Sequence, residues 1–151
     1  MAFDVNIKTQ SVLDTESVGE ALAKTLLEEP ELPRFVALFG DLGVGKTAFV
    51  RGFTKVIAPD ARVKSPTFAL VNEYRGAGLS VFHFDMYRIE SEDDLYSIGF
   101  YDYADRHGIC LTEWSENIEY ALPEEYIRVE IVKDAAQNPD SRQISASYIG
   151  V

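Results

Sequence analysis

The chain has 151 residues, of which 46% are hydrophobic, and this composition fits a single folded domain spanning residues 1–151 rather than a disordered chain. Asp and Glu number 25 against 14 Lys and Arg, so the formal net charge of −11 argues against direct nucleic-acid binding and favours a protein partner. The sequence contains no apolar run of membrane-spanning length and does not begin with a signal peptide, which together predict a cytoplasmic protein.

The chain opens with one predicted strand and one predicted helix. Apolar and polar residues alternate from Phe3 to Lys8, which indicates a strand with one covered face. We expect a helix next, with Asp14 or Thr15 as its N-cap and its end before Pro30. Both elements precede the glycine-rich segment that follows.

That segment has the pattern of a strand, a phosphate loop and a helix. Phe35–Phe39 is an almost unbroken apolar run, typical of a strand buried on both faces. Gly40–Thr47 reads Gly-Asp-Leu-Gly-Val-Gly-Lys-Thr and fits the Walker A pattern G-x-x-x-x-G-K-[ST]. Apolar residues then recur at helical spacing until Pro59, which ends the predicted helix.

The residue types of the loop suit a nucleoside triphosphate. Glycines let backbone N–H groups surround phosphate oxygens, and the following helix N-terminus favours an anion. Lys46 would reach the β- and γ-phosphates as a point charge, while the Thr47 hydroxyl would ligate Mg²⁺. Adenine specificity is not encoded here, because the loop contacts phosphates and not the base.

A hydroxyl-bearing turn follows at Ser65-Pro66-Thr67. Pro66 keeps Ser65 out of the helical region, and alternation from Phe68 to Asn72 predicts that a strand starts at this turn. Two interpretations stay open. Either Ser65 or Thr67 senses the γ-phosphate, as such loops do in nucleotide switches, or the segment is a capped turn without a ligand.

Two later strands are predicted to end in carboxylates. Ser80–Asp85 ends in Asp85, where phosphate-loop proteins hold Mg²⁺ or its bound water. His83 faces the same side as Asp85, and it is either part of the site or a hydrogen-bonded core imidazole. The strand over Ile109–Trp114 places Glu113 where it would polarise the attacking water or add to the metal shell.

Other residues of the second half predict packing. Cys110, the only cysteine, is expected to be a buried strand residue rather than a reactive thiol. Ser91–Gly99 reads as a short helix with an N-cap serine and a terminating glycine. The aromatic residues of Phe100–Gly108 are expected in the core, with a partner-binding surface as the alternative.

The C-terminal part predicts an antiparallel hairpin that closes the sheet, built from Tyr126–Val132 and Arg142–Tyr148. The fold class that we predict is therefore α/β, a three-layer P-loop NTPase-like fold. Its central sheet is expected to be mixed and mostly parallel, with the hairpin at the C-terminal end.

Four motifs in order resemble the TsaE family: Gly40–Thr47, Ser65–Phe68 with Asn72-Glu73-Tyr74 behind it, His83–Arg88, and Glu113-Trp114. The resemblance extends from the Asp14-Thr15 helix start to the final hairpin. One departure is Val44, where Ala is commoner in the loop, and we expect no functional change from it because this residue contributes its backbone.

The resemblance implies an ATPase that is weak alone and is needed for threonylcarbamoyladenosine at position 37 of tRNAs that read codons starting with A. It implies ATP and Mg²⁺ as cofactors and the TsaD and TsaB proteins as partners. TsaC makes the threonylcarbamoyl-adenylate, ATP hydrolysis supports TsaD turnover, and tRNA is contacted only through TsaD. No membrane is involved.

Roles for individual residues also follow from the resemblance. Catalytic roles are implied for Lys46, Asp85 and Glu113, and metal ligation for Thr47, Asp85 and Glu113. The implied nucleotide-binding residues are Thr15, Asp41, Leu42, Gly43, Val44, Gly45, Lys46, Thr47, Ser65, Thr67 and Trp114.

Two other functions remain open at the level of the residues. A small-molecule kinase would need a substrate-binding insertion and an arginine-bearing lid, for which the interval from Thr47 to Asp85 leaves little room. A nucleotide-dependent switch with little turnover is the second alternative. Arg51, Arg75 and Arg88 are equal candidates for stabilising charge in the transition state.

Overall fold

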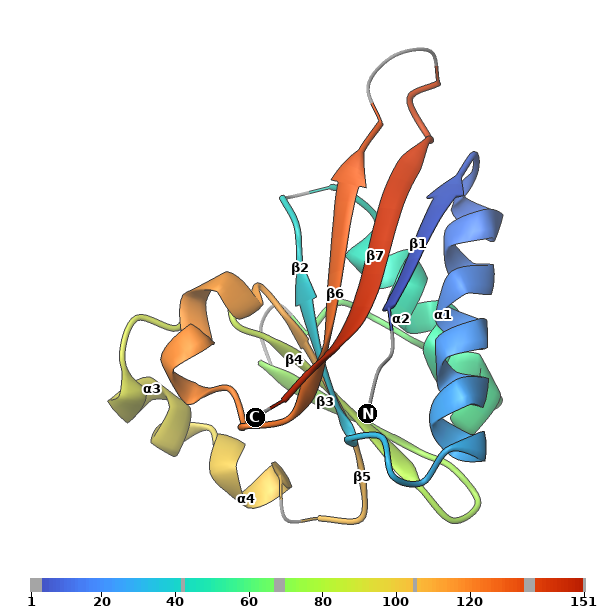
Figure 1. Ribbon diagram of the computed structural model, residues 1–151. Coiled ribbons are helices and arrows are strands. Elements are labelled where there is room, and N and C mark those ends of the chain that lie inside the picture. Colours follow the sequence, from blue (N-terminus) through green and yellow to red (C-terminus); the bar gives the residue numbers. More distant parts are fainter. Residues whose placement is uncertain (1–3, 42, 67–69, 105, 135–137, 151) are drawn as a thin grey trace.

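The computed structural model describes residues 4–41, 43–66, 70–104, 106–134 and 138–150 (Figure 1). The predicted contributions of Phe3, Leu42, Thr67 and Phe68 therefore lie outside the described residues. In chain order the elements are β1 (Asp4–Thr9), α1 (Val12–Glu28), β2 (Phe35–Phe39), α2 (Lys46–Ile57), β3 (Val71–Arg75), β4 (Ser80–Asp85), α3 (Glu92–Ser97), α4 (Phe100–Ala104), β5 (Gly108–Glu113), the 3-10 helix η1 (Ser115–Ala121), β6 (Tyr126–Lys133) and β7 (Arg142–Ile149).

The strands form one sheet in the order β1-β7-β6-β2-β5-β4-β3. The four central strands, β6, β2, β5 and β4, are parallel, whereas β3, β7 and β1 add antiparallel partners at the two flanks. The predicted C-terminal hairpin is confirmed. It does not close the sheet, however, because β1 pairs along β7 from Asp4 to Thr9 and forms the edge itself.

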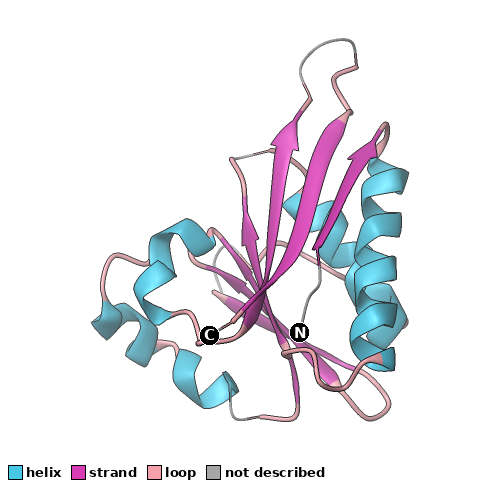
Figure 2. Cartoon of the chain, viewed as in Figure 1, coloured by secondary structure: helices cyan, strands magenta, loops and turns pink. Residues whose placement is uncertain are grey.

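Helices cover both faces of this sheet and give three layers (Figures 1 and 2). The helices α1 and α2 lie on one face, and α3, α4 and η1 lie on the other. The strand β2 is buried on both sides, since Val36 and Leu38 join the core under α1 and α2 while Phe35 and Phe39 join the core under α3. The predicted three-layer α/β fold with a mixed sheet is thus confirmed.

The helix that follows the phosphate loop is held tightly against α1. A methyl group on Gly19 would overlap the Phe49 carbonyl, and one on Gly52 would overlap the Glu16 carbonyl. Only glycine allows the two backbones to approach this closely. The packing therefore fixes α2, and with it the end of the loop, relative to the sheet.

Two predicted boundaries were wrong. The N-cap of α1 is Ser11, whose hydroxyl accepts a hydrogen bond from the Asp14 N–H at 3.1 Å, while Thr15 is buried one turn into the helix. The strand predicted from Phe68 begins at Val71 instead, because Leu70 has φ 67°, a left-handed conformation that a strand cannot contain.

The predicted helix and the buried cysteine are confirmed, whereas the predicted aromatic core is confirmed for Phe100 alone, because Tyr101 and Tyr103 are half-buried and His107 is exposed. Ser91 caps α3, and Gly99 follows it with φ 72°. Phe100 packs edge-on against Phe35 at a centroid distance of 6.0 Å, so this ring lies in the core. Cys110 is buried, and burial raises the pKa of its thiol to about 12. Within the described ranges, no helix has the length and apolar character needed to cross a membrane.

Candidate functional site

The phosphate loop joins the C-terminal end of β2 to the first residue of α2. Its glycines adopt backbone angles that side-chain-bearing residues rarely adopt, with φ 148° at Gly40, 77° at Gly43 and 105° at Gly45. Gly45 is the N-cap of α2, so the unpaired N–H groups of the first helical turn open toward the loop. The loop and the helix N-terminus together form a cradle that suits an anion.

A cavity of about 460 Å³ lies beside this loop. It brings together residues from the loop, the turn after α2 and the ends of β4 and β5. The lining residues are Gly43, Gly45, Lys46, Thr47, Ser65, Asp85, Tyr87, Arg88, Glu113 and Trp114. The strand-end carboxylates and the Walker A residues predicted from sequence therefore share one cavity.

Lys46 is folded into the cavity wall, with only 5% of its surface exposed. Its Nζ donates to the Gly40 carbonyl at 2.6 Å and lies 3.7 Å from the centroid of the Trp114 ring. Burial lowers the Lys46 pKa, and the acidic groups nearby, led by Glu116 and Glu113, act in the opposite direction. The ammonium is thus held at the cavity by a carbonyl and a ring face, without a direct ion pair to a carboxylate among the described contacts.

Trp114 is presented by an unusual backbone. It follows β5 with φ 59°, a left-handed conformation that is rare for a bulky side chain. Its ring also packs against Tyr87 at a centroid distance of 5.0 Å. A backbone outlier of this kind at a cavity wall is typical of functional sites, where the surrounding structure maintains the strain.

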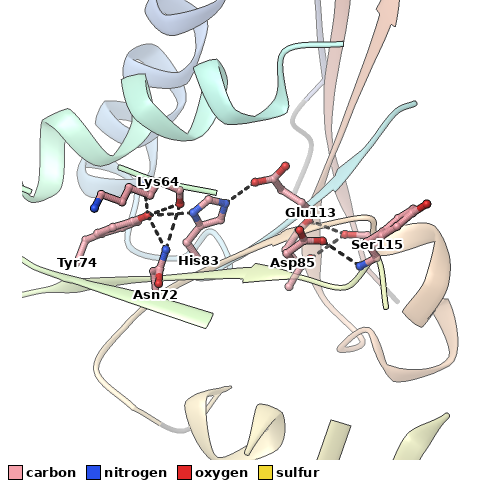
Figure 3. A network of polar contacts seen from close by, with 9 residues as sticks. Lys64, Asn72, Tyr74, His83, Asp85, Glu113 and Ser115 are labelled. Carbon is pink, nitrogen blue, oxygen red and sulfur yellow. Dashed lines mark hydrogen bonds and ion pairs between the residues drawn. The ribbon is translucent and has the colours of Figure 1, made fainter. Parts of the chain in front are cut away.

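Asp85 and Glu113 are neighbours because β4 and β5 are parallel and pair these two residues in register. An Asp85 oxygen accepts a hydrogen bond from the Tyr87 N–H at 2.9 Å, while Glu113 is 5% exposed and bonded to the Nε2 of His83. His83 is fully buried. His83 therefore combines both predicted roles: it is a hydrogen-bonded core imidazole, and it contacts a carboxylate of the cavity (Figure 3).

The donors of this cavity fit Mg²⁺. Thr47, Asp85 and Glu113 offer hydroxyl and carboxylate oxygens, the ligand type that Mg²⁺ prefers. No cluster of three or more His, Cys, Asp or Glu side chains able to hold a metal occurs in the described part of the chain. Where Mg²⁺ binds together with a nucleotide, phosphates and water complete the coordination of one or two carboxylates.

Other predicted nucleotide-binding residues lie around the cavity rather than in its lining. Thr15 lies beside Gly45, since a Cβ atom added to Gly45 would be 3.8 Å from the Thr15 methyl carbon. The Val44 side chain is buried, and Asp41 is exposed on the outside of the loop. Leu42 and Thr67 lie outside the described residues.

Sequence reasoning missed Arg142, at the start of β7. Its guanidinium donates to the Val44 carbonyl at 2.7 Å and to the Gly43 carbonyl at 3.5 Å. It also donates to the carbonyls of Pro139 and Ser141 in the turn between β6 and β7. The phosphate loop is therefore held from outside by the C-terminal hairpin, a contact that no local pattern indicates.

Glu116 was missed as well. This residue of η1 accepts a hydrogen bond from the Gly40 N–H at 3.0 Å. It also exerts the largest favourable charge effect on Lys46. The first glycine of the loop is thus held in place by a carboxylate 76 positions along the chain.

The structure places the three candidate arginines in different surroundings. Arg88 lines the cavity. Arg51 lies on α2, 3.9 Å from Glu16 of α1, and Arg75 pairs with Glu73 at 3.1 Å on the edge strand β3. Arg88 is therefore the candidate that the fold brings to the described cavity.

Comparisons with known proteins agree with this architecture. Residues 9–144 match the family model "Threonylcarbamoyl adenosine biosynthesis protein TsaE". The chain is 42% identical to the tRNA threonylcarbamoyladenosine biosynthesis protein TsaE of Haemophilus influenzae, over 82% of this chain and 80% of that protein. It is 35% identical to the Bacillus subtilis protein of the same name, over 87% of this chain and 80% of that protein. A crystal structure of Bacillus subtilis YdiB superposes with a TM-score of 0.76 at 28% identity, covering 99% of this chain and 88% of that one.

Proposed function

This chain belongs to the TsaE family, and on that premise we propose that it binds and hydrolyses ATP in the formation of threonylcarbamoyladenosine on tRNA. The names of its relatives state the pathway. The observation that supports the ATPase assignment is the single cavity that unites Lys46 and Thr47 with Asp85 and Glu113. These are the parts that phosphoryl transfer needs, since it depends on positioning and on charge stabilisation.

The loop and Lys46 bind the phosphates in this proposal. Backbone N–H groups of Gly43 and Gly45 would bind phosphate oxygens, for which the Lys46 ammonium would exchange the Gly40 carbonyl. The exchange replaces a neutral acceptor by a charged one, so the bond becomes stronger. Thr47 and Asp85 would hold Mg²⁺, which when bound would supply positive charge that neutralises the phosphates.

Glu113 orients the attacking water, with Asp85 as the other carboxylate in reach. The water oxygen bonds to the γ-phosphorus in line with the departing ADP oxygen, its proton passes to a carboxylate or to phosphate, and the products are ADP and inorganic phosphate. Glu113 suits this role because its carboxylate is buried and one oxygen is already held by His83. Arg88 and Lys46 stabilise the charge that develops on the γ-phosphoryl group.

The protein acts through TsaB and TsaD rather than on tRNA directly. The net charge of −11 supports this part of the proposal, because an acidic surface repels the tRNA backbone and leaves a protein partner to contact it. The hydrolysis of ATP supports repeated turnover of TsaD.

Complementation tests the pathway. In a bacterium depleted of its own TsaE protein, this chain should restore threonylcarbamoyladenosine in total tRNA, measured by mass spectrometry of nucleosides. Lys46→Ala should fail, whereas Lys55→Ala on the exposed side of the same helix, 3.6 Å from Glu20, should succeed. Failure of the expressed, folded wild-type chain would contradict the role in tRNA modification.

A further inference from the structure

A buried hydrogen-bond network starts at Glu113 and ends on the backbone of Lys64 (Figure 3). The Glu113 carboxylate bonds to the Nε2 of His83, and the Nδ1 of His83 lies 3.2 Å from the Tyr74 hydroxyl oxygen. That oxygen accepts the Lys64 N–H at 3.1 Å and lies 3.0 Å from the Lys64 carbonyl. His83, Tyr74 and Glu113 are at most 6% exposed, so water is excluded from the Glu113–His83 and His83–Tyr74 bonds, whereas the bonds to the exposed residue Lys64 are half-buried.

One arrangement of protons satisfies the whole network with a neutral imidazole. The Nε2–H of His83 donates to the Glu113 carboxylate, so Nδ1 accepts, and the Tyr74 hydroxyl is the donor within its reach. The Lys64 carbonyl keeps a donor of its own, because the Asn72 side-chain amide donates to it at 3.1 Å. Both ring nitrogens of His83, the Tyr74 hydroxyl and the Lys64 carbonyl thereby have partners.

The network connects three neighbouring strands to the segment at Ser65. Glu113 lies at the end of β5, His83 on β4 and Tyr74 on the edge strand β3. Lys64 immediately precedes Ser65, which itself lines the cavity. Ser65 and Glu113 therefore line the same cavity. Glu113 is also linked to the backbone next to Ser65 through the side chains of His83 and Tyr74.

We propose that His83 and Tyr74 are positioning residues that fix the Glu113 carboxylate relative to the Lys64-Ser65 backbone and so align Glu113 on the attacking water. The inference rests on the proposed ATP hydrolysis. A glutamate has three rotatable side-chain bonds, and one oxygen held by a buried imidazole limits them. A displacement of about 1 Å in a reacting group can lower a rate about a hundredfold, so a network of this kind governs kcat.

Tyr74→Phe tests the proposal, since it removes the hydroxyl and keeps the ring. With TsaB and TsaD present, we expect kcat for ATP hydrolysis to fall about tenfold while KM changes less than about twofold, because the nucleotide-binding residues are untouched. Tyr148→Phe is the matched control. It also removes a hydrogen-bonded tyrosine hydroxyl, here one that donates to Glu125, and it does so outside the cavity lining.

A double-mutant cycle separates positioning from a general loss of stability. Added to Glu113→Gln, Tyr74→Phe should lower kcat no further, because the residue through which it acts has already been changed. A full additional loss of kcat in the double variant would overturn the proposal, as would an unchanged kcat in Tyr74→Phe alone.

Nuclear magnetic resonance gives a readout that does not depend on hydrolysis. The chain has only two histidines, and His107 is exposed, so a slowly exchanging imidazole N–H signal should belong to His83. We expect this signal to move in Tyr74→Phe and when a non-hydrolysable ATP analogue is added to the wild type. If the wild type releases no phosphate, the proposed ATP hydrolysis is contradicted, and the imidazole signal then tests the hydrogen-bond network separately. A signal that changes neither in Tyr74→Phe nor on addition of the analogue would overturn the proposed network.

Discussion

The ammonium of Lys46 lies 3.7 Å from the centroid of the Trp114 ring. Because Trp114 is the only tryptophan, tryptophan fluorescence reports on the surroundings of this one ring, which include the Lys46 ammonium. Phosphates that bind to Lys46 should draw the ammonium away from the ring face and change the emission. We therefore predict a saturable fluorescence change on titration with ATP, absent in Lys46→Met. Unchanged emission while calorimetry records ATP binding would contradict this account of the contact.

The Arg142 contacts with the phosphate loop predict a loss of nucleotide affinity when they are removed. Arg142→Gln deletes charge-assisted hydrogen bonds to the carbonyls of Val44 and Gly43, and such bonds contribute about 1.5–3 kcal/mol each. We expect ATP affinity to fall about tenfold or more, measured by calorimetry. Lys133→Gln is the control, because it removes one positive charge from the exposed residue paired with Arg142 in β6. Equal affinities in the two variants would count against a role for Arg142.

We predict that the Thr47 hydroxyl contributes to nucleotide affinity only when Mg²⁺ is present. Thr47→Ala should lower affinity for Mg-ATP and leave the weaker binding of ATP in excess chelator unchanged, because the hydroxyl would ligate the metal. Thr47→Ser keeps the hydroxyl and should bind Mg-ATP like the wild type. A parallel loss with and without Mg²⁺ would place the role of Thr47 in the fold rather than at the metal.

The close contact of α1 and α2 predicts a stability effect. Gly52→Ala would force a methyl group into the Glu16 carbonyl, and overpacking of this kind costs about 1–3 kcal/mol. Urea denaturation should show this decrease in the free energy of unfolding. Gly78→Ala is the matched control, since nothing lies within 4 Å of the added methyl, and its stability should be close to that of the wild type. A fully stable Gly52→Ala would show that the helices can separate without cost.

The buried position of Cys110 predicts that, at alkaline pH, its thiol reacts with alkylating reagents in the unfolded chain but not in the native one. Burial raises its thiol pKa to about 12, whereas a thiol in an unfolded chain ionises near about 8.5. The native thiol therefore stays protonated at pH 9 while the unfolded one loses its proton. The contribution of this group to stability is fully present below about pH 8.5 and declines as the pH rises above it. Iodoacetamide at pH 9 should label the urea-unfolded chain and spare the native one, and rapid native labelling would contradict the buried position.

The parts of the site that are local in sequence could be predicted. The loop glycines and Lys46 follow from one motif, and Asp85 and Glu113 follow from the rule that parallel strands present their carboxyl ends at one edge. Arg142 and Glu116 could not be predicted, because their contacts depend on the placement of β6 beside β2 and on the path of η1.

The two boundary errors have different origins. The N-cap was assigned to Asp14 or Thr15 from residue preference, while the structure uses Ser11 and buries Thr15 against Thr9 at the edge of the sheet. The Ser11 cap is a local feature, because Ser11 and Asp14 follow the Ser-x-x-Asp pattern of a helix start and both side chains accept backbone N–H groups there. Leu70 is held by one local and one distant bond, since its N–H donates to the Pro66 carbonyl and its carbonyl accepts the Asp85 N–H.

The release of phosphate from Mg-ATP by the purified chain tests the central claim most directly, alone and with TsaB and TsaD, with Lys46→Ala as the blank. Our account predicts release above the blank that the two partners stimulate. Release equal to the blank under both conditions would contradict ATP hydrolysis, and nucleotide-dependent partner affinity in that case would instead support a switch.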